Sequence, residues 1–251
     1  MLKKWTVTVP PLSGNTPRKA YVYLPDSYEE EPDKRYGVLY MFDGHNIFLD
    51  EDAAFGKSWG MKKYMDDSEK ELIIVAVECN HHGNHRLMEY TPVSYRNKNH
   101  GFVPAKAPVY MKWMVQWLKP YIDKHYRTLP DPEHTALAGS SMGGLIALYG
   151  VTAYNHVFRK AASLSPSLWV SPGKLLAMVA GGNYAPDTVI YMSYGQNEMG
   201  NHKANRWALR TVATELFAKG VNLTFRVVPN ADHSEGAWEK QVPVFMDCLG
   251  L

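Results

Sequence analysis

Short apolar runs alternate with longer segments of helical periodicity along most of this 251-residue chain. The runs at 36–44 and 71–80 (YGVLYMFDG and ELIIVAVECN) end in turn residues, which is typical of strands buried on both faces. Helical spacing occupies 59–70 between them and 109–126 after them, with Pro120 expected to bend or break the second helix. This alternation predicts an α/β fold with a mostly parallel central sheet and helices on both faces. No linker or repeat interrupts the pattern, so we expect 1–251 to form a single domain.

The remaining predicted elements continue this alternation of strands and helices. We expect further strands at 3–9, 19–25, 134–139, 161–166, 188–195 and 223–229, and further helices at 143–153, 173–181, 201–219 and 236–249. The stretch 80–107 is polar and lacks periodicity, so we expect a long loop there. It follows a central strand and should therefore emerge at the carboxyl edge of the sheet, where α/β proteins bind ligands.

Composition excludes several classes of function. A net charge of +2 without a basic run argues against a nucleic-acid or membrane surface. The first residues contain no apolar signal-peptide core, and the longest aliphatic run, 72–77, is far too short to span a bilayer. These features favour a cytoplasmic protein that acts on a small molecule. Cys79 and Cys248 are expected to be reduced, with a disulfide as the alternative.

A pair of serines between glycines is the strongest chemical signal. Gly139 to Gly143 (GSSMG) fits the G-x-S-x-G pattern only if Ser141 is the central residue. An apolar strand precedes the motif and a helix follows it, which is the setting of a nucleophile elbow. The alternative is an ordinary Gly/Ser loop, but the strand and helix favour Ser141 as a nucleophile.

A serine nucleophile needs a base and an acid to orient that base. In α/β-hydrolases the acid and then the histidine follow the serine along the chain. Glu198 follows the strand at 188–195, and His233 follows the last strand, so both should open at the same sheet edge as Ser141. The alternatives are a solvated loop carboxylate and a surface histidine. Among competing acids, Asp187 precedes its strand, and Asp232 and Glu235 adjoin His233 too closely to orient its ring.

Backbone N–H groups should hold the oxyanion that forms on the attacked carbonyl. We expect one from Met142, the residue after the nucleophile, and one from His45 in the loop FDGHNIF. Ser165 and Ser167 are interpreted as structural residues, and Trp169 as either a pocket wall or a core residue.

The ordered segments VLYMFDGHNIF, GSSMGG, SLSPSLW, YGQNE and DHSEGAW resemble the "Putative esterase" family of the α/β-hydrolase superfamily. That family includes feruloyl and acetylxylan esterases, siderophore trilactone esterases and mycolyltransferases. The resemblance runs from about residue 5 to 248 and implies a single-domain α/β-hydrolase. The segment HRLMEYTP also resembles a family segment, which implies that Arg86 and Tyr90 face the site as substrate-binding residues.

The expected activity is cleavage of carboxylic esters without a cofactor. No second cluster at ligand spacing completes a site with the histidines in NHHGNHR (His81, His82 and His85), so we expect no metal. Two alternatives remain: an acyltransferase that uses the same acyl-enzyme, and a non-catalytic binding protein on the same fold. The substrate is expected to be a carbohydrate or aromatic acyl ester, or a siderophore lactone.

Overall fold

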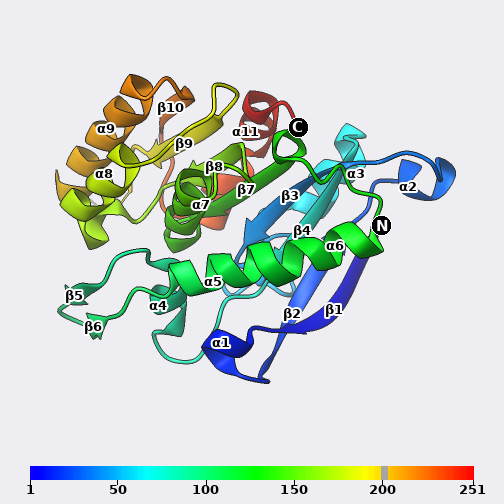
Figure 1. The fold of residues 1–251 in the computed structure, drawn as a ribbon, viewed down its shortest axis with the longest axis horizontal. Helices are drawn as coiled ribbons and strands as arrows, with labels where there is room; N and C mark the ends of the chain where they lie inside the picture. The colour runs from blue at the N-terminus through cyan, green and yellow to red at the C-terminus, as the bar shows by residue number, and fades with distance from the viewer. Residues whose placement is uncertain (199–202) are drawn as a thin grey trace.

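The computed structural model describes residues 1–198 and 203–251. Eight strands form one sheet in the order β1-β2-β4-β3-β7-β8-β9-β10 (Figure 1). The strands that lie in the sheet are β1 Leu2–Thr8, β2 Pro17–Tyr23, β3 Gly37–Phe42, β4 Leu72–Val77, β7 Thr135–Ser140, β8 Lys160–Leu164, β9 Val189–Gly195 and β10 Asn222–Val228. The pairs from β4 to β10 are parallel, whereas β1 and β2 add to one end in antiparallel fashion. The predicted mostly parallel α/β sheet is confirmed.

Helices cover both faces of this sheet. One face packs against α4 His85–Tyr90, α5 Ala107–Trp113, α6 Lys119–His125, α7 Met142–Ala153, α8 Pro172–Ala180 and α9 Lys203–Ala218, and the other against α3 Met61–Ser68, α10 Glu235–Glu239 and α11 Val242–Leu249. Two layers of helices are needed because the central strands are apolar on both faces. Val38, Tyr40 and Phe42 of β3 join one core, while Leu39 and Met41 join the other.

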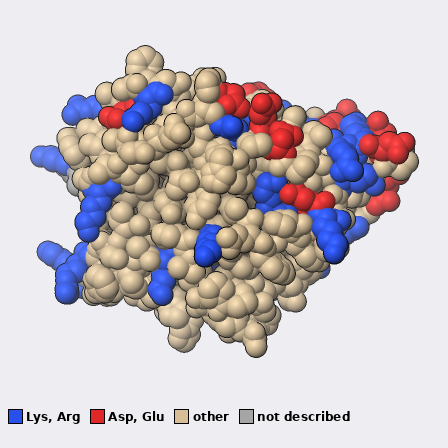
Figure 2. Space-filling view, viewed as in Figure 1, with Lys and Arg blue, Asp and Glu red and all other residues tan. Residues whose placement is uncertain are grey.

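The remaining short elements lie outside the sheet. They are α1 Pro10–Ser13, α2 Ser27–Glu30, a two-stranded hairpin of β5 Tyr95–Asn97 and β6 Gly101–Val103, and the single turns η1 Gly44–Asn46, η3 Pro132–His134 and η4 Leu168–Val170. No helix in the described ranges is long and apolar enough to cross a membrane. On the face shown in Figure 2, acidic side chains gather toward the end that carries α2 and α3, among interspersed lysines and arginines.

The predicted helix at 109–126 forms, but with a wider turn in its middle. A π-helical segment, η2 Met114–Leu118, joins α5 to α6, and the N–H of Lys119 donates to the carbonyl of Met114, five residues back. Pro120 has no N–H to donate, and its ring would crowd a carbonyl of the preceding turn in a regular helix. The wider turn lets the helix continue past the proline.

Two other predictions need correction. The expected loop at 80–107 contains α4 and the β5–β6 hairpin, which its polar composition concealed. The expected single helix at 236–249 is two helices, because Pro243 lies in the first turn of α11 and a proline is tolerated there but not inside a helix. The expected start of α9 at residues 201–202 lies outside the described residues. Cys79 and Cys248 are both free, as predicted.

Candidate active site

Ser141 lies in a sharp turn between β7 and α7. Its backbone has φ 57° and ψ −121°, a conformation that costs free energy for any residue with a Cβ. The turn requires close approach of its own backbone: a Cβ at Gly139 would lie 2.6 Å from the carbonyl group of Gly143. The Ser141 N–H donates to the carbonyl of Leu164 on the neighbouring strand at 2.9 Å. The turn therefore has the geometry of a nucleophile elbow.

Glu198 follows β9 and is buried, with 2% of its surface exposed. Its Oε1 atom accepts hydrogen bonds from the N–H of Gly195 at 2.7 Å and from the hydroxyl of Ser165. The Oε2 atom lies 2.9 Å from Nδ1 of His233. Both carboxylate oxygens thus have donors, which fixes the plane of the carboxylate.

His233 follows β10, and its ring is held from two directions. Nδ1 donates to Glu198, and the ring meets Trp238 edge-on at a centroid distance of 4.9 Å. The indole N–H of Trp238 in turn donates to the hydroxyl of Ser165 at 3.0 Å. With Nδ1 engaged, Nε2 is the nitrogen that remains for proton exchange.

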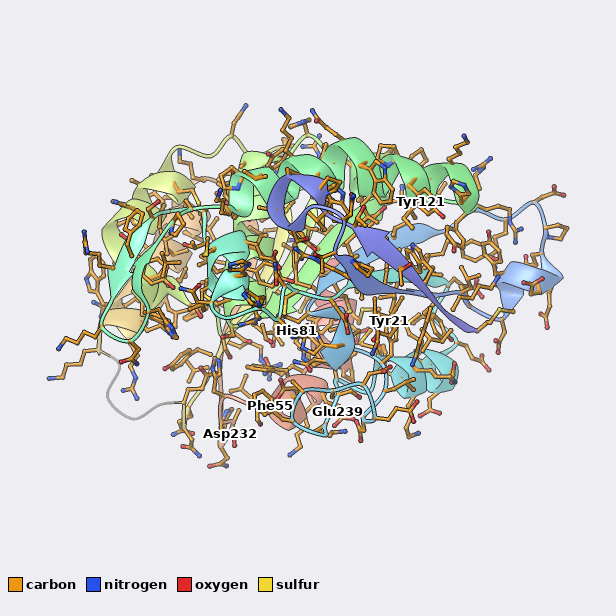
Figure 3. The ribbon with its side chains drawn as sticks, turned by 90° about the horizontal axis from the view of Figure 1, so that it is seen from below. Tyr21, Phe55, His81, Tyr121, Asp232 and Glu239 are labelled. Atoms are coloured by element: carbon orange, nitrogen blue, oxygen red, sulfur yellow. The ribbon has the colours of Figure 1, made fainter. Side chains whose placement is uncertain are left out.

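Ser141 and His233 line the same cavity, whose volume is about 520 Å³. The Ser141 hydroxyl lies 3.4 Å from the hydroxyl of Ser167. His81 and Phe55, both labelled in Figure 3, also line this cavity. Phe55 is 82% exposed, so its ring presents an apolar surface at the rim of the cavity. A cavity of this size is typical of small-molecule sites.

The carboxylates of the three competing acids have other partners. Asp187 lies 3.7 Å from Arg159. Asp232 is exposed and accepts a hydrogen bond from the hydroxyl of Ser234, its near neighbour. Glu235 lines the cavity, but its carboxylate accepts from the amide of Asn46 at 3.1 Å. Of the four candidates, Glu198 is the one whose carboxylate contacts the His233 ring.

The two backbone groups expected to hold an oxyanion lie at the starts of helical turns. Met142 is the first residue of α7, so its N–H has no acceptor within the helix. His45 is in η1, and η1 packs so tightly on β4 that a Cβ at Gly44 would lie 2.9 Å from backbone atoms of Val77. His45 also lines the cavity.

An ion pair supports the loop that carries His45. The Arg86 guanidinium binds the Asp43 carboxylate through two hydrogen bonds of 2.7 and 2.8 Å. Burial alone would raise the pKa of Asp43, but the charge and hydrogen bonds of Arg86 outweigh it and lower that pKa. A Cβ at Gly143 would lie 2.9 Å from Oδ2 of Asp43, so the pair also abuts the elbow.

The expectation that Tyr90 faces the site is wrong, whereas Trp169 packs against the core, one of its two expected placements. Arg86 lines the cavity, but Tyr90 is fully buried against Phe42 and Tyr110. Its hydroxyl accepts the N–H of Asp43 at 3.2 Å, so it supports the loop and does not face the cavity. Trp169 is half-buried and packs edge-on against Tyr95 of the β5–β6 hairpin, outside the cavity lining.

Sequence reasoning missed the roles of two serines. Ser165 joins Glu198 to Trp238, and Ser167 contacts the hydroxyl of Ser141. The signal that could have revealed them is their position after β8, at the same carboxyl edge of the sheet as the elbow.

Comparison with known proteins identifies the family. Residues 13–246 match the family described as "Putative esterase". The uncharacterized protein YbbA of Bacillus subtilis (strain 168) is 24% identical over 189 residues, which cover 74% of this chain and 70% of that protein. A ferulic acid esterase superposes with a TM-score of 0.71 at 19% identity, covering 100% of this chain and 96% of that chain. The siderophore hydrolase EstA from Aspergillus nidulans gives a TM-score of 0.72 at 17% identity, covering 98% and 94% of the two chains.

These structural relatives share the α/β-hydrolase fold described above. The family match spans nearly the whole sheet and the cavity at its carboxyl edge. The chain therefore belongs to the "Putative esterase" family and is a carboxylic ester hydrolase.

Proposed function

We propose that the protein is a serine esterase that works through an acyl-enzyme, with Ser141 as nucleophile, His233 as base and Glu198 as the acid that orients the base. The observation that carries this proposal is the 2.9 Å contact between His233 and Glu198 beside a cavity that Ser141 also lines. A buried carboxylate on Nδ1 fixes the tautomer in which Nε2 can accept a proton.

The reaction follows from these positions. The Ser141 hydroxyl attacks the ester carbonyl as Nε2 of His233 takes its proton, and the N–H groups of Met142 and His45 hold the oxyanion. The tetrahedral intermediate collapses, and His233 returns the proton to the departing alcohol. A water molecule, deprotonated by His233, then releases the acyl group and restores the serine. Glu198 stabilises the imidazolium in both halves of the reaction.

The substrate class that we propose is an aromatic acyl ester of a carbohydrate or a siderophore lactone. A ferulic acid esterase and a siderophore hydrolase among the structural relatives support this range. The exposed ring of Phe55 on the cavity rim is a surface against which an aromatic group can stack. Arg86 in the cavity wall adds a donor for polar substituents.

Active-site labelling combined with turnover tests the proposal. A fluorophosphonate should label Ser141 in the wild-type protein and in Ser140→Ala, which removes the neighbouring hydroxyl. Ser141→Ala should lose the label and lower kcat by about 10⁴- to 10⁶-fold. Labelling that maps to Ser140, or full turnover by Ser141→Ala, would refute the assignment.

A substrate panel then separates the classes. Feruloyl, acetyl and butyryl esters and a catecholate lactone should be compared by kcat/KM, with and without added alcohols. Preference for feruloyl or catecholate esters supports the proposed class. Transfer of the acyl group to an added alcohol in preference to water would show an acyltransferase.

A further inference from the structure

Three potential metal ligands meet in the wall of the cavity. His45 comes from η1, and Cys79 and His81 come from the segment just after β4. Each residue offers one ligand atom, and these atoms all lie within 4.8 Å of one another. All three residues line the same cavity as Ser141, so an ion can reach them from solvent. The mechanism above uses none of these three side chains.

The spacing suits a tetrahedral ion. The Sγ atom of Cys79 lies 3.9 Å from Nδ1 of His81. Zinc bonds of about 2.3 Å to sulfur and about 2.0 Å to nitrogen place two tetrahedral ligand atoms about 3.5 Å apart. A shift of a few tenths of an ångström therefore brings this pair to ligand distance. The rings of His45 and His81 meet edge-on at a centroid distance of 4.5 Å.

The side chain of His45 supplies an independent indication of a metal site. Its side chain is buried, and its Nδ1 atom has no hydrogen-bond partner within the described part of the chain. A buried polar atom without a partner is costly, and buried ring nitrogens are normally satisfied. A neutral imidazole nitrogen is also the form of histidine that binds metals.

We propose that His45, Cys79 and His81 bind a thiophilic divalent cation, Zn²⁺, and that the bound ion inhibits ester hydrolysis. Three protein ligands leave a fourth position open toward the cavity. An ion there occupies the space next to the His45 backbone, whose N–H is assigned to the oxyanion. The binding site stands on its own contacts, whereas the inhibition rests on the proposed function.

Binding replaces the S–H bond of Cys79 by a Zn–S bond and releases the proton to the buffer. Zinc binds the thiolate form of cysteine, so the ion competes with a proton for the Cys79 sulfur. Affinity should accordingly weaken as the pH falls.

Cobalt binding tests the site without any need for turnover. Co²⁺ added to chelator-treated protein should bind one to one and show thiolate-to-cobalt absorption, which Zn²⁺ should abolish by competition. The absorption should persist in the control variants Cys248→Ser and His82→Ala and disappear in Cys79→Ser. His81 is exposed, so His81→Ala should fold normally and weaken binding by at least about tenfold. Absence of the absorption, or unchanged affinity in both Cys79→Ser and His81→Ala, would overturn the site.

Turnover of an activated ester tests the inhibition separately. Ser141→Ala should bind Co²⁺ like the wild-type protein, so failure of the proposed catalysis leaves the binding result intact. Zn²⁺ should lower wild-type turnover over the same concentration range in which it displaces Co²⁺, and a chelator should restore it. Cobalt binding with turnover that Zn²⁺ leaves unchanged would retain the site and overturn the inhibition.

Discussion

The carboxylate of Glu198 lies 2.9 Å from Nδ1 of His233, although the two residues follow different strands. The parallel pairing of β9 with β10 explains this contact. Val228 lies beside Gly195 at the last position of the pairing, so both strands end at the same level of the sheet. Each loop then turns over the sheet edge, where the two side chains meet.

Replacement of Glu198 by Gln should lower kcat by about 10³- to 10⁴-fold and leave the fold intact. A neutral amide can accept from Ser165 and Gly195, but it does not stabilise the imidazolium or select its tautomer. Steady-state kinetics and circular dichroism check both parts. Asp232→Asn is the matched control, since Asp232 adjoins His233 but bonds Ser234. Near-normal turnover in Glu198→Gln would show that the acid lies elsewhere.

Removal of the Ser165 hydroxyl should destabilise the protein and leave the Glu198 carboxylate less firmly held. Ser165→Ala takes one donor from the buried carboxylate and the acceptor from Trp238, so the free energy of unfolding should fall by about 1.5–3 kcal/mol. Ser165 has a positive φ of 46°, so Ser165→Gly removes the same hydroxyl without a strained Cβ. Urea unfolding of both variants separates the loss of the hydroxyl from the strain of a Cβ at this φ. Equal stability of Ser165→Ala and the wild-type protein would contradict this role.

Ser141→Gly should be more stable than Ser141→Ala by about 1 kcal/mol, although both variants lose activity. Both remove the hydroxyl that we propose as the nucleophile, but Ala keeps a Cβ in a backbone conformation that favours glycine. Chemical unfolding measures the difference. If Ala and Gly are equally stable, the elbow holds no backbone strain at this position.

The Asp43–Arg86 pair should make stability depend on pH in acid. Because the pKa of Asp43 is lower in the folded chain, its contribution is fully present above the unfolded value, near 4, and is lost as the pH falls through the folded value. Asp43→Asn suits the test, since Asp43 has a φ of 58° and asparagine tolerates this conformation. The difference in unfolding free energy between the wild-type protein and Asp43→Asn should shrink below about pH 4. A difference that stays constant from pH 3 to 7 would argue against the pair as its source.

The alternating pattern was sufficient to predict the sheet and most of its helices, because strands buried on both faces leave continuous apolar runs. The order of Ser141, Glu198 and His233 along the chain likewise predicts that all three lie at one sheet edge. Contacts between loops, in contrast, cannot be predicted from the sequence pattern. The meeting of His45 with Cys79 depends on how closely Gly44 approaches β4, and the burial of Tyr90 depends on a helix hidden in a polar segment. Neither contact produces a periodic pattern of apolar residues in the sequence.

The residues of the proposed triad and those of the cavity wall lie on different kinds of backbone segment. Ser141, Glu198 and His233 are attached to strand ends that the sheet holds in register, whereas Phe55 and Arg86 belong to segments inserted between strands. The exposed ring of Phe55 can therefore be exchanged while the sheet keeps the residues of the proposed triad in place. Variants at Phe55 should change the acyl preference of the proposed reaction, whereas changes at the strand ends should mostly yield inactive protein.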